Sequence, residues 1–173
     1  MERMKMIKSA QFSEGRIYRY TLDRIWDPSK PLVQFVGLNP STADEDNEDN
    51  TVWGCMKRAE AWGFGGMVMT NVFAFVSTDP KPLHKMSDRM QAIGPLNDYW
   101  LAQAYMRCAM TVCCWGNHGG LFYRHLEIPD LILASYCFKL TKQDQPHHPL
   151  YLKHDIKQDE LIPFTKYGLR VRG

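Results

Sequence analysis

A short apolar run, residues 32–36, is followed at once by the turn sequence Gly37-Leu38-Asn39-Pro40-Ser41. Five mostly apolar residues suit a buried strand. Pro40 has no N–H and disfavours helical backbone at Asn39, so the chain must turn there. The sequence therefore predicts a polar amide at the carboxyl end of a central strand, where open α/β sheets form their ligand crevices. The alternative is that Asn39 only caps backbone groups of an ordinary turn.

Strand-like and helix-like segments alternate along the rest of the chain. Opening strands are expected within 15–26. Later strands are expected at 67–75, 110–115 and 131–138, and helices at 51–62 and 97–108. Strands that alternate with helices imply crossover connections and parallel pairing. The predicted fold is α/β, a three-layer sandwich with a mainly parallel central sheet.

Chain length and composition narrow the class of protein. With 173 residues and a hydrophobic share of 45%, the chain is expected to form a single domain over residues 1–173, with a core at about 16–155 and a C-terminal tail at 156–173. A net charge of +2 does not by itself indicate nucleic-acid binding. The five cysteines include no C-x-x-C pair, which favours a reduced protein without structural zinc. Neither a signal peptide nor a run of about 20 apolar residues is found. We therefore expect a cytoplasmic monomer with no membrane contact.

Polar groups follow predicted strands at three separate points of the chain. Asn39 follows the first core strand, Asn71 lies within the second, and His147 and His148 follow the last. The carboxyl ends of parallel strands share one edge of a sheet, so these side chains are expected to converge. Asn71 has a plain structural alternative, because a buried amide often serves only to bond neighbouring backbone.

Three motifs together resemble a bacterial and phage family, the domain-of-unknown-function family 1643, over most of residues 16–155. They are Gly37-Leu38-Asn39-Pro40-Ser41-Thr42-Ala43-Asp44, Thr70-Asn71-Val72-Phe73 and Pro146-x-His148-Pro149-Leu150-Tyr151-Leu152. More distantly, the layout is similar to the uracil-DNA glycosylase superfamily. Its mismatch-specific branches carry Gly-x-Asn-Pro-Gly, its thermostable branches carry Thr-Asn-Val, and most members carry a His-Pro or Asn-Pro third motif. This resemblance implies a uracil-DNA-glycosylase-like fold.

The distant resemblance also implies a function, the hydrolysis of an N-glycosidic bond in a modified or damaged base of DNA or of a nucleotide, without a cofactor. Asn39 would orient the attacking water, and His148 would stabilise negative charge on the departing base. Asn71 would read a base edge. The remaining implied binding residues comprise a stacking ring, a wedge loop and their neighbours: Gly37, Leu38, Pro40, Ser41, Asp44, Phe73, Phe75, Pro149, Leu150 and Tyr151.

The chain departs from the glycosylase pattern in three places. Ser41 replaces the glycine after Asn-Pro, the third motif lacks its usual serine, and the four cysteine ligands of the thermostable branches are absent. Two other functions therefore stay open. One is a non-catalytic module that binds a nucleotide or nucleic acid, and the other is a nucleotide-processing enzyme that uses Asp44 with a divalent ion.

Metal and phosphate sites have weaker signals. His147 and His148 are adjacent, so they point to opposite sides of an extended chain and rarely bind one ion. The acidic run 44–49 lacks the glycine and glutamate of a calcium loop. We therefore expect no metal site. The glycine-rich segment 116–120 is a candidate phosphate cradle at a helix start, with a turn capped by its asparagine as the alternative. Lys139, Lys142 and Lys153 are candidate phosphate contacts.

Overall fold

The computed structural model describes residues 5–164 of the chain. The strands are β1 (Ile7–Phe12), β2 (Arg19–Ile25), β3 (Leu32–Gly37), β4 (Gly66–Asn71), β5 (Met110–Cys113), β6 (Ser135–Cys137) and β7 (Ile162–Phe164). The α-helices are α1 (Asn50–Ala61), α2 (Lys81–His84), α3 (Arg89–Ile93), α4 (Asn97–Arg107) and α5 (Ile128–Leu131). Short 3₁₀ segments are η1 (Glu14–Arg16), η2 (Asn117–Leu126), η3 (Pro149–Tyr151) and η4 (Gln158–Glu160).

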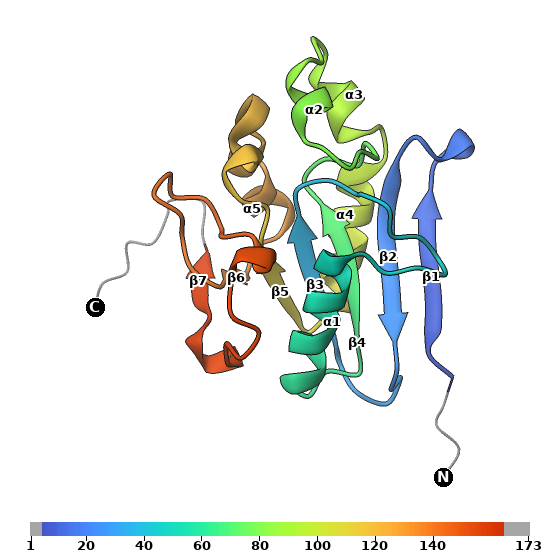
Figure 1. Ribbon diagram of the computed structural model, residues 1–173, viewed down its shortest axis with the longest axis vertical. Helices are drawn as coiled ribbons and strands as arrows, with labels where there is room; N and C mark the ends of the chain where they lie inside the picture. Colours follow the sequence, from blue (N-terminus) through green and yellow to red (C-terminus); the bar gives the residue numbers. More distant parts are fainter. Residues whose placement is uncertain (1–4, 165–173) are drawn as a thin grey trace.

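The seven strands form one mixed sheet in the order β1-β2-β4-β3-β5-β6-β7 (Figure 1). Strands β4, β3, β5 and β6 are parallel, whereas β1 and β2 on one side and β7 on the other pair antiparallel. The expectation of a mainly parallel sheet was therefore wrong. The reason is that β1 and β2 are joined by a short connection, which cannot return the chain for parallel pairing.

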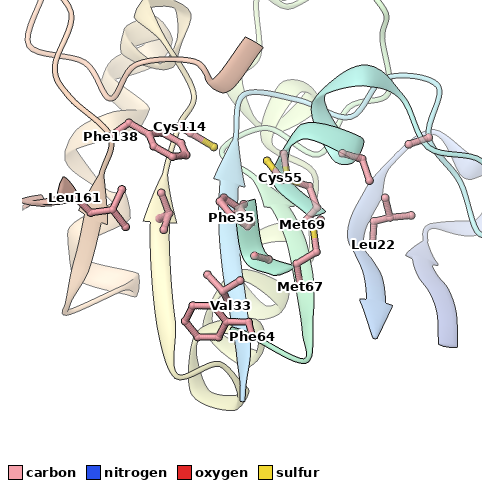
Figure 2. Close-up of a cluster of buried hydrophobic side chains, with 14 residues drawn as sticks. Leu22, Val33, Phe35, Cys55, Phe64, Met67, Met69, Cys114, Phe138 and Leu161 are labelled. Carbon is pink, nitrogen blue, oxygen red and sulfur yellow. The ribbon is translucent and has the colours of Figure 1, made fainter. Parts of the chain in front are cut away.

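Helices flank the sheet on both faces. On β3, Val33 and Phe35 pack in the cluster beneath α1, while Val36 packs in the cluster beneath α2 to α5. Figure 1 shows α1 in front of the sheet and α4 behind it. Figure 2 shows the α1-side cluster, in which Cys55 of α1 faces the strands that carry Phe35 and Met69. Within residues 5–164, no helix combines the length and the apolar character needed to cross a membrane.

A buried polar ladder joins the three central strands on the α4 side. Gln34 of β3, fully buried, donates from Nε2 to Thr70 Oγ1 of β4 at 3.1 Å. The Oε1 atom of Gln34 accepts a hydrogen bond from Thr111 Oγ1 of β5 at 2.8 Å. Because every member finds a partner, this network holds β4, β3 and β5 in register just below their carboxyl ends.

Helix α1 begins earlier than the sequence predicts. It starts at Asn50 with Asp49 as its N-cap, whereas the sequence predicts a helix from residue 51, and the Asp49 side chain accepts a hydrogen bond from the Val52 N–H at 2.8 Å. A carboxylate suits this position because it pairs with free N–H groups at the positive end of the helix dipole. The helix then ends with Trp62 as its C-cap.

Two predicted strands are shorter in the structure. β4 ends at Asn71 rather than at residue 75, because the chain then turns to α3, where the Ala74 N–H donates to Ile93 O at 3.0 Å. The segment 131–138 contains only the three residues of β6. Its first residue, Leu131, ends α5, a short helix with a proline in its first turn, where proline favours the start of a helix.

The C-terminal segment also differs from the expected tail at 156–173. Residues 162–164 form β7, which pairs antiparallel with β6 and brings Phe164 against Trp115, with 5.4 Å between the ring centroids. This burial of an aromatic side chain makes the segment part of the sheet. Residues 165–173 of the predicted tail lie outside the described residues.

A candidate functional site at the carboxyl edge of the sheet

A cavity of about 740 Å³ opens at the carboxyl ends of β3, β4 and β5. Its walls come from the loops after these strands, from the N-terminus of α1 and from the segment 141–151. Residues expected from the sequence that line it are Gly37, Leu38, Asn39, Ser41, Asn71, His148, Leu150 and Tyr151. Two amides and an imidazole that are far apart in the sequence therefore share one cavity of a size usual for ligand pockets.

Asn39 is held by the loop that follows β4. Its Nδ2 donates to Ser77 O at 2.8 Å and to Pro40 O at 3.1 Å. In return, the Ser77 N–H donates to Pro40 O at 2.8 Å. The amide nitrogen thus caps backbone groups, as the structural alternative proposed. Because both of its hydrogens are used in this way, the orientation is set, and Oδ1 is the atom of the amide that remains to accept a hydrogen bond.

Asn71 ends β4 and is almost entirely buried, with 2% of its surface exposed. Its backbone carbonyl accepts a hydrogen bond from Asn97 Nδ2 at 2.9 Å. Its own Nδ2 is buried without a hydrogen-bond partner among residues 5–164. An unpaired buried donor is costly. Since the side chain lines the cavity, a ligand acceptor would remove that cost.

His148 presents a neutral imidazole to the cavity. Its Nδ1 accepts a hydrogen bond from the Leu150 N–H at 3.3 Å, which assigns the proton of the neutral ring to Nε2. Burial, with a smaller contribution from neighbouring His147, lowers the pKa of His148 to about 4 against the opposing effect of Asp49. At neutral pH the ring is therefore uncharged and offers an N–H donor.

One backbone contact and one tryptophan side chain position the His148 segment. The Gly116 N–H donates to Pro146 O at 2.8 Å, and Trp115 Nε1 donates to Gln145 Oε1 at 2.9 Å. Gly116 has φ +72°, a left-handed conformation that favours glycine. The loop after β5 therefore fixes where His148 enters the cavity.

Arg58 of α1 anchors the other end of the same segment. Its side chain is fully buried, and its Nη2 donates to Pro149 O at 3.1 Å, to Leu152 O at 3.2 Å and to Lys153 O at 3.0 Å. Three carbonyls from one short stretch thus share one guanidinium nitrogen. This explains why Leu150 and Tyr151, which lie between the anchored residues, are held at the cavity mouth.

Five residues expected to bind substrate do not line the cavity: Pro40, Asp44, Phe73, Phe75 and Pro149. Phe73 is fully buried and packs edge-to-face on Phe122, while Phe75 packs on Tyr18, so neither ring presents a stacking face to this cavity. The aromatic residues that do line it are Trp115 and Tyr151. The apolar strand pattern of the sequence did not reveal where the two phenylalanines lie, because residues 72–75 leave the sheet and both rings pack in the cluster beneath α2 to α5.

The other three residues serve the surrounding loops. The Asp44 Oδ1 accepts hydrogen bonds from Asp46 N, Asn47 N and Asn47 Nδ2, and these backbone contacts are the main cause of its lowered pKa. Pro40 and Pro149 contribute backbone carbonyls, to Ser77 and to Arg58 respectively. Within residues 5–164, no three His, Cys, Asp or Glu side chains are grouped to hold a metal ion.

Sequence reasoning missed two charged residues that line the cavity, Arg19 and Asp49. Asp49 had a signal, since Asp-Asn-Thr-Val is a typical helix start. Arg19 had none. A bulge in the β1–β2 pairing, where Gln11 pairs with Thr21 but Phe12 with Arg19, leaves Tyr20 unpaired. A bulge changes which face the next side chain occupies, so this one turns Arg19 towards the loop after β3.

The comparisons with known proteins agree with the motifs. A family model described as "Protein of unknown function (DUF1643)" matches residues 19–150. Searches of curated proteins and of solved structures found no significant match. The matched region contains β2 to β6 and the residues of the cavity up to Leu150. The chain therefore belongs to the DUF1643 family of proteins of unknown function.

Proposed function

We propose that this cavity hydrolyses the N-glycosidic bond of a modified or damaged base in a nucleotide or in DNA, on a fold related to the uracil-DNA glycosylases. One observation carries the proposal: Asn39, Asn71 and His148 line a single cavity with complementary hydrogen-bonding capacity. Asn39 offers an acceptor, Asn71 an unpaired buried donor, and His148 a neutral N–H donor.

These groups match the needs of the reaction. The bond between the sugar carbon and the base nitrogen breaks, and the electron pair leaves with the base. A water molecule adds to the sugar carbon and loses a proton to the departing base or to solvent. The His148 Nε2–H donates to the base oxygen on which negative charge develops, and a donor already in place stabilises that charge without reorganisation. Asn39 Oδ1 accepts a hydrogen bond from the water and so directs its oxygen at the sugar carbon.

Base recognition falls to Asn71. An amide carries both a donor and an acceptor and can pair with a base edge in two hydrogen bonds. Its side chain lies beside Gly37, where a Cβ would be 2.8 Å from Asn71 Oδ1. The glycine therefore leaves space for the amide at the floor of the cavity.

The rim of the cavity suits a polynucleotide as well as a nucleotide. Leu150 and Tyr151 line the mouth and are 48% and 79% exposed, which is unusual for large apolar side chains in adjacent positions. In DNA, such side chains can fill the gap that a flipped-out nucleotide leaves in the stack. Arg58 holds their loop in place for that role.

The decisive experiment looks for free base by mass spectrometry after incubation with nucleotides and with oligonucleotides that carry varied bases. The wild-type protein is compared with His148→Ala and Asn39→Ala, and His154→Ala serves as a matched control, because His154 is exposed and lies outside this cavity. Loss of the His148 donor is expected to slow base release by about 10²–10³-fold. Substrate binding without product in the whole panel would instead indicate a non-catalytic binding module.

A further inference from the structure

We propose that the cavity binds a phosphate group of its ligand through Arg19. Resting on the proposed function, this names the substrate class: the base is presented as a phosphorylated nucleotide unit rather than as a free nucleoside. Nothing in the sequence singled out Arg19, and none of the functional roles above uses it.

Arg19 is buried but poorly paired. Only 2% of its surface is exposed, although it lines the cavity. Its Nη1 donates to Ala43 O, and its Nε is buried without a partner among residues 5–164. Burial lowers its pKa to about 10, so the guanidinium stays charged at neutral pH. A buried charge without a bonded counter-ion is unfavourable unless a ligand supplies one.

The other fully buried arginines are better satisfied. Arg24 pairs with Glu48 at 2.8 Å and also donates to backbone carbonyls. Arg124 pairs with carboxylates of α4 and of its own turn. Arg58 also lacks a bonded carboxylate, and its Nε is likewise unpaired among residues 5–164, but its two Nη atoms donate four hydrogen bonds to backbone carbonyls. Arg19 differs because it makes a single hydrogen bond among the described residues, so most of its donors are unpaired in a residue of the cavity lining, and a guanidinium matches phosphate geometry well.

The start of α1 adds a second anion-binding element to the same cavity. Asp49, Asn50, Thr51 and Val52 all line it, and α1 has 12 residues. The Asp49 cap bonds the N–H groups of Val52 and Trp53, which leaves those of Asn50 and Thr51 for a ligand. A helix N-terminus carries a partial positive charge and attracts phosphates.

Asp49 is the acidic residue in the lining, and its carboxylate already serves the α1 N–H groups. It also raises the pKa of Arg19 without forming an ion pair with it among the described residues. Because the Asp49 carboxylate is engaged at the α1 N-terminus rather than paired with Arg19, the guanidinium charge remains for a phosphate, either a phosphodiester with one negative charge or a monophosphate with between one and two near neutral pH.

The phosphate contacts suggested by the sequence do not contribute to this site. Lys139, Lys142 and Lys153 are exposed and do not line the cavity. The glycine-rich segment 116–120 opens a distorted 3₁₀ segment, and Gly119 packs on Trp115, where a Cβ would be 2.0 Å from Cδ1. That glycine thus serves packing against the tryptophan.

The test measures binding by calorimetry for each common nucleoside, for its 5′-monophosphate and for a dinucleoside phosphodiester. Inorganic phosphate serves as a competitor. For wild-type protein we expect the phosphorylated ligand to bind at least about tenfold tighter than the matched nucleoside, by the usual strength of charge-assisted pairs. In Arg19→Gln this ratio should fall to near one. Tighter binding of the 5′-monophosphate would indicate that a free nucleotide supplies the phosphate, and tighter binding of the phosphodiester would indicate a nucleic-acid strand.

Arg24→Gln is the matched control, because Arg24 lies on the same strand and binds the same loop but is absent from the cavity lining. Arg24→Gln should lower the stability of the fold but leave the ratio of phosphorylated-ligand affinity to nucleoside affinity unchanged. If Arg19→Gln does not fold, Arg19→Lys retains the charge and should retain part of the preference. An equal ratio in wild-type protein and the Arg19 variants would overturn the inference, even if base release is observed. An Arg19-dependent preference without any released base would instead reject hydrolysis and keep the phosphate site.

Discussion

Gly37 and Asn71 are direct neighbours in the parallel pairing of β3 and β4, and the Asn71 amide occupies the space that a side chain on Gly37 would need. A Cβ at residue 37 would lie 2.8 Å from Asn71 Oδ1 and 2.7 Å from Met69 Cε. The first residue of the turn motif thus determines where the amide at the cavity floor can lie. The absence of a side chain at residue 37 in the first motif thus sets the position of an amide in the second motif.

The first prediction concerns Gly37→Ala. The added methyl group must displace Asn71 or Met69, so the free energy of unfolding should fall by about 1–3 kcal/mol. Ligand affinity should fall as well, because the displaced amide loses its position. Urea denaturation and calorimetry measure the two effects. Gly120→Ala is the control, since the nearest atom to its Cβ is 4.0 Å away. Unchanged stability and affinity in Gly37→Ala would contradict the contact.

The second prediction concerns the protonation of His148. Its pKa in the folded protein is about 4, below the ordinary value of 6.5. Between these two values the unfolded chain binds more protons than the native state, so the free energy of unfolding should rise with pH in this window and level off above it. Titration of the ring by NMR should show a midpoint near pH 4. A midpoint near 6.5 would mean that the ring is not shielded as the structure indicates.

The third prediction concerns Arg58→Met. The change leaves the carbonyls of Pro149, Leu152 and Lys153 without their shared donor. Each unsatisfied buried acceptor costs about 1–3 kcal/mol, so the loss of stability should reach about 3 kcal/mol. Amide hydrogen exchange at Leu150 should accelerate because its loop is released. Lys57→Met, on the exposed side of α1, should change stability by less than about 0.5 kcal/mol.

The fourth prediction concerns the rim residues and rests on the proposed function. Tyr151→Ala should leave stability within about 0.5 kcal/mol of wild type, since the side chain is exposed. If Tyr151 fills the stack after a base is flipped, base release from duplex DNA should slow by about tenfold. Release from a mononucleotide should slow much less. Parallel assays on the two substrates check this, and equal effects on both would argue against a wedge.

The fifth prediction concerns Asp44→Ala. Its carboxylate binds loop N–H groups and lies outside the cavity lining, so base release should persist and should be insensitive to a chelator. The loop should be destabilised above about pH 4, where the carboxylate is charged in both the folded and the unfolded chain, and the difference from wild type should shrink as the pH falls through its lowered pKa. Base release that stops in this variant and requires added Mg²⁺ would support the metal-dependent alternative instead.

Local sequence determined the parts of this protein that depend on neighbouring residues. The strand before Gly37, the helix that ends near Trp62 and the placement of Asn39 after a strand follow from apolar periodicity and from turn residues. The convergence of Asn39, Asn71 and His148 followed from one further rule, that parallel strands place their carboxyl ends at one edge.

Only the tertiary structure decided the direction of the outer strands, the burial of Phe73 and the position of Arg19. Strand direction depends on pairing between distant segments, and a β-bulge shifts a side chain to the other face without any mark in the local pattern. The charge on Arg19 was visible in the sequence. Its lack of a bonded counter-ion was not, because that depends on which carboxylates the fold brings within reach.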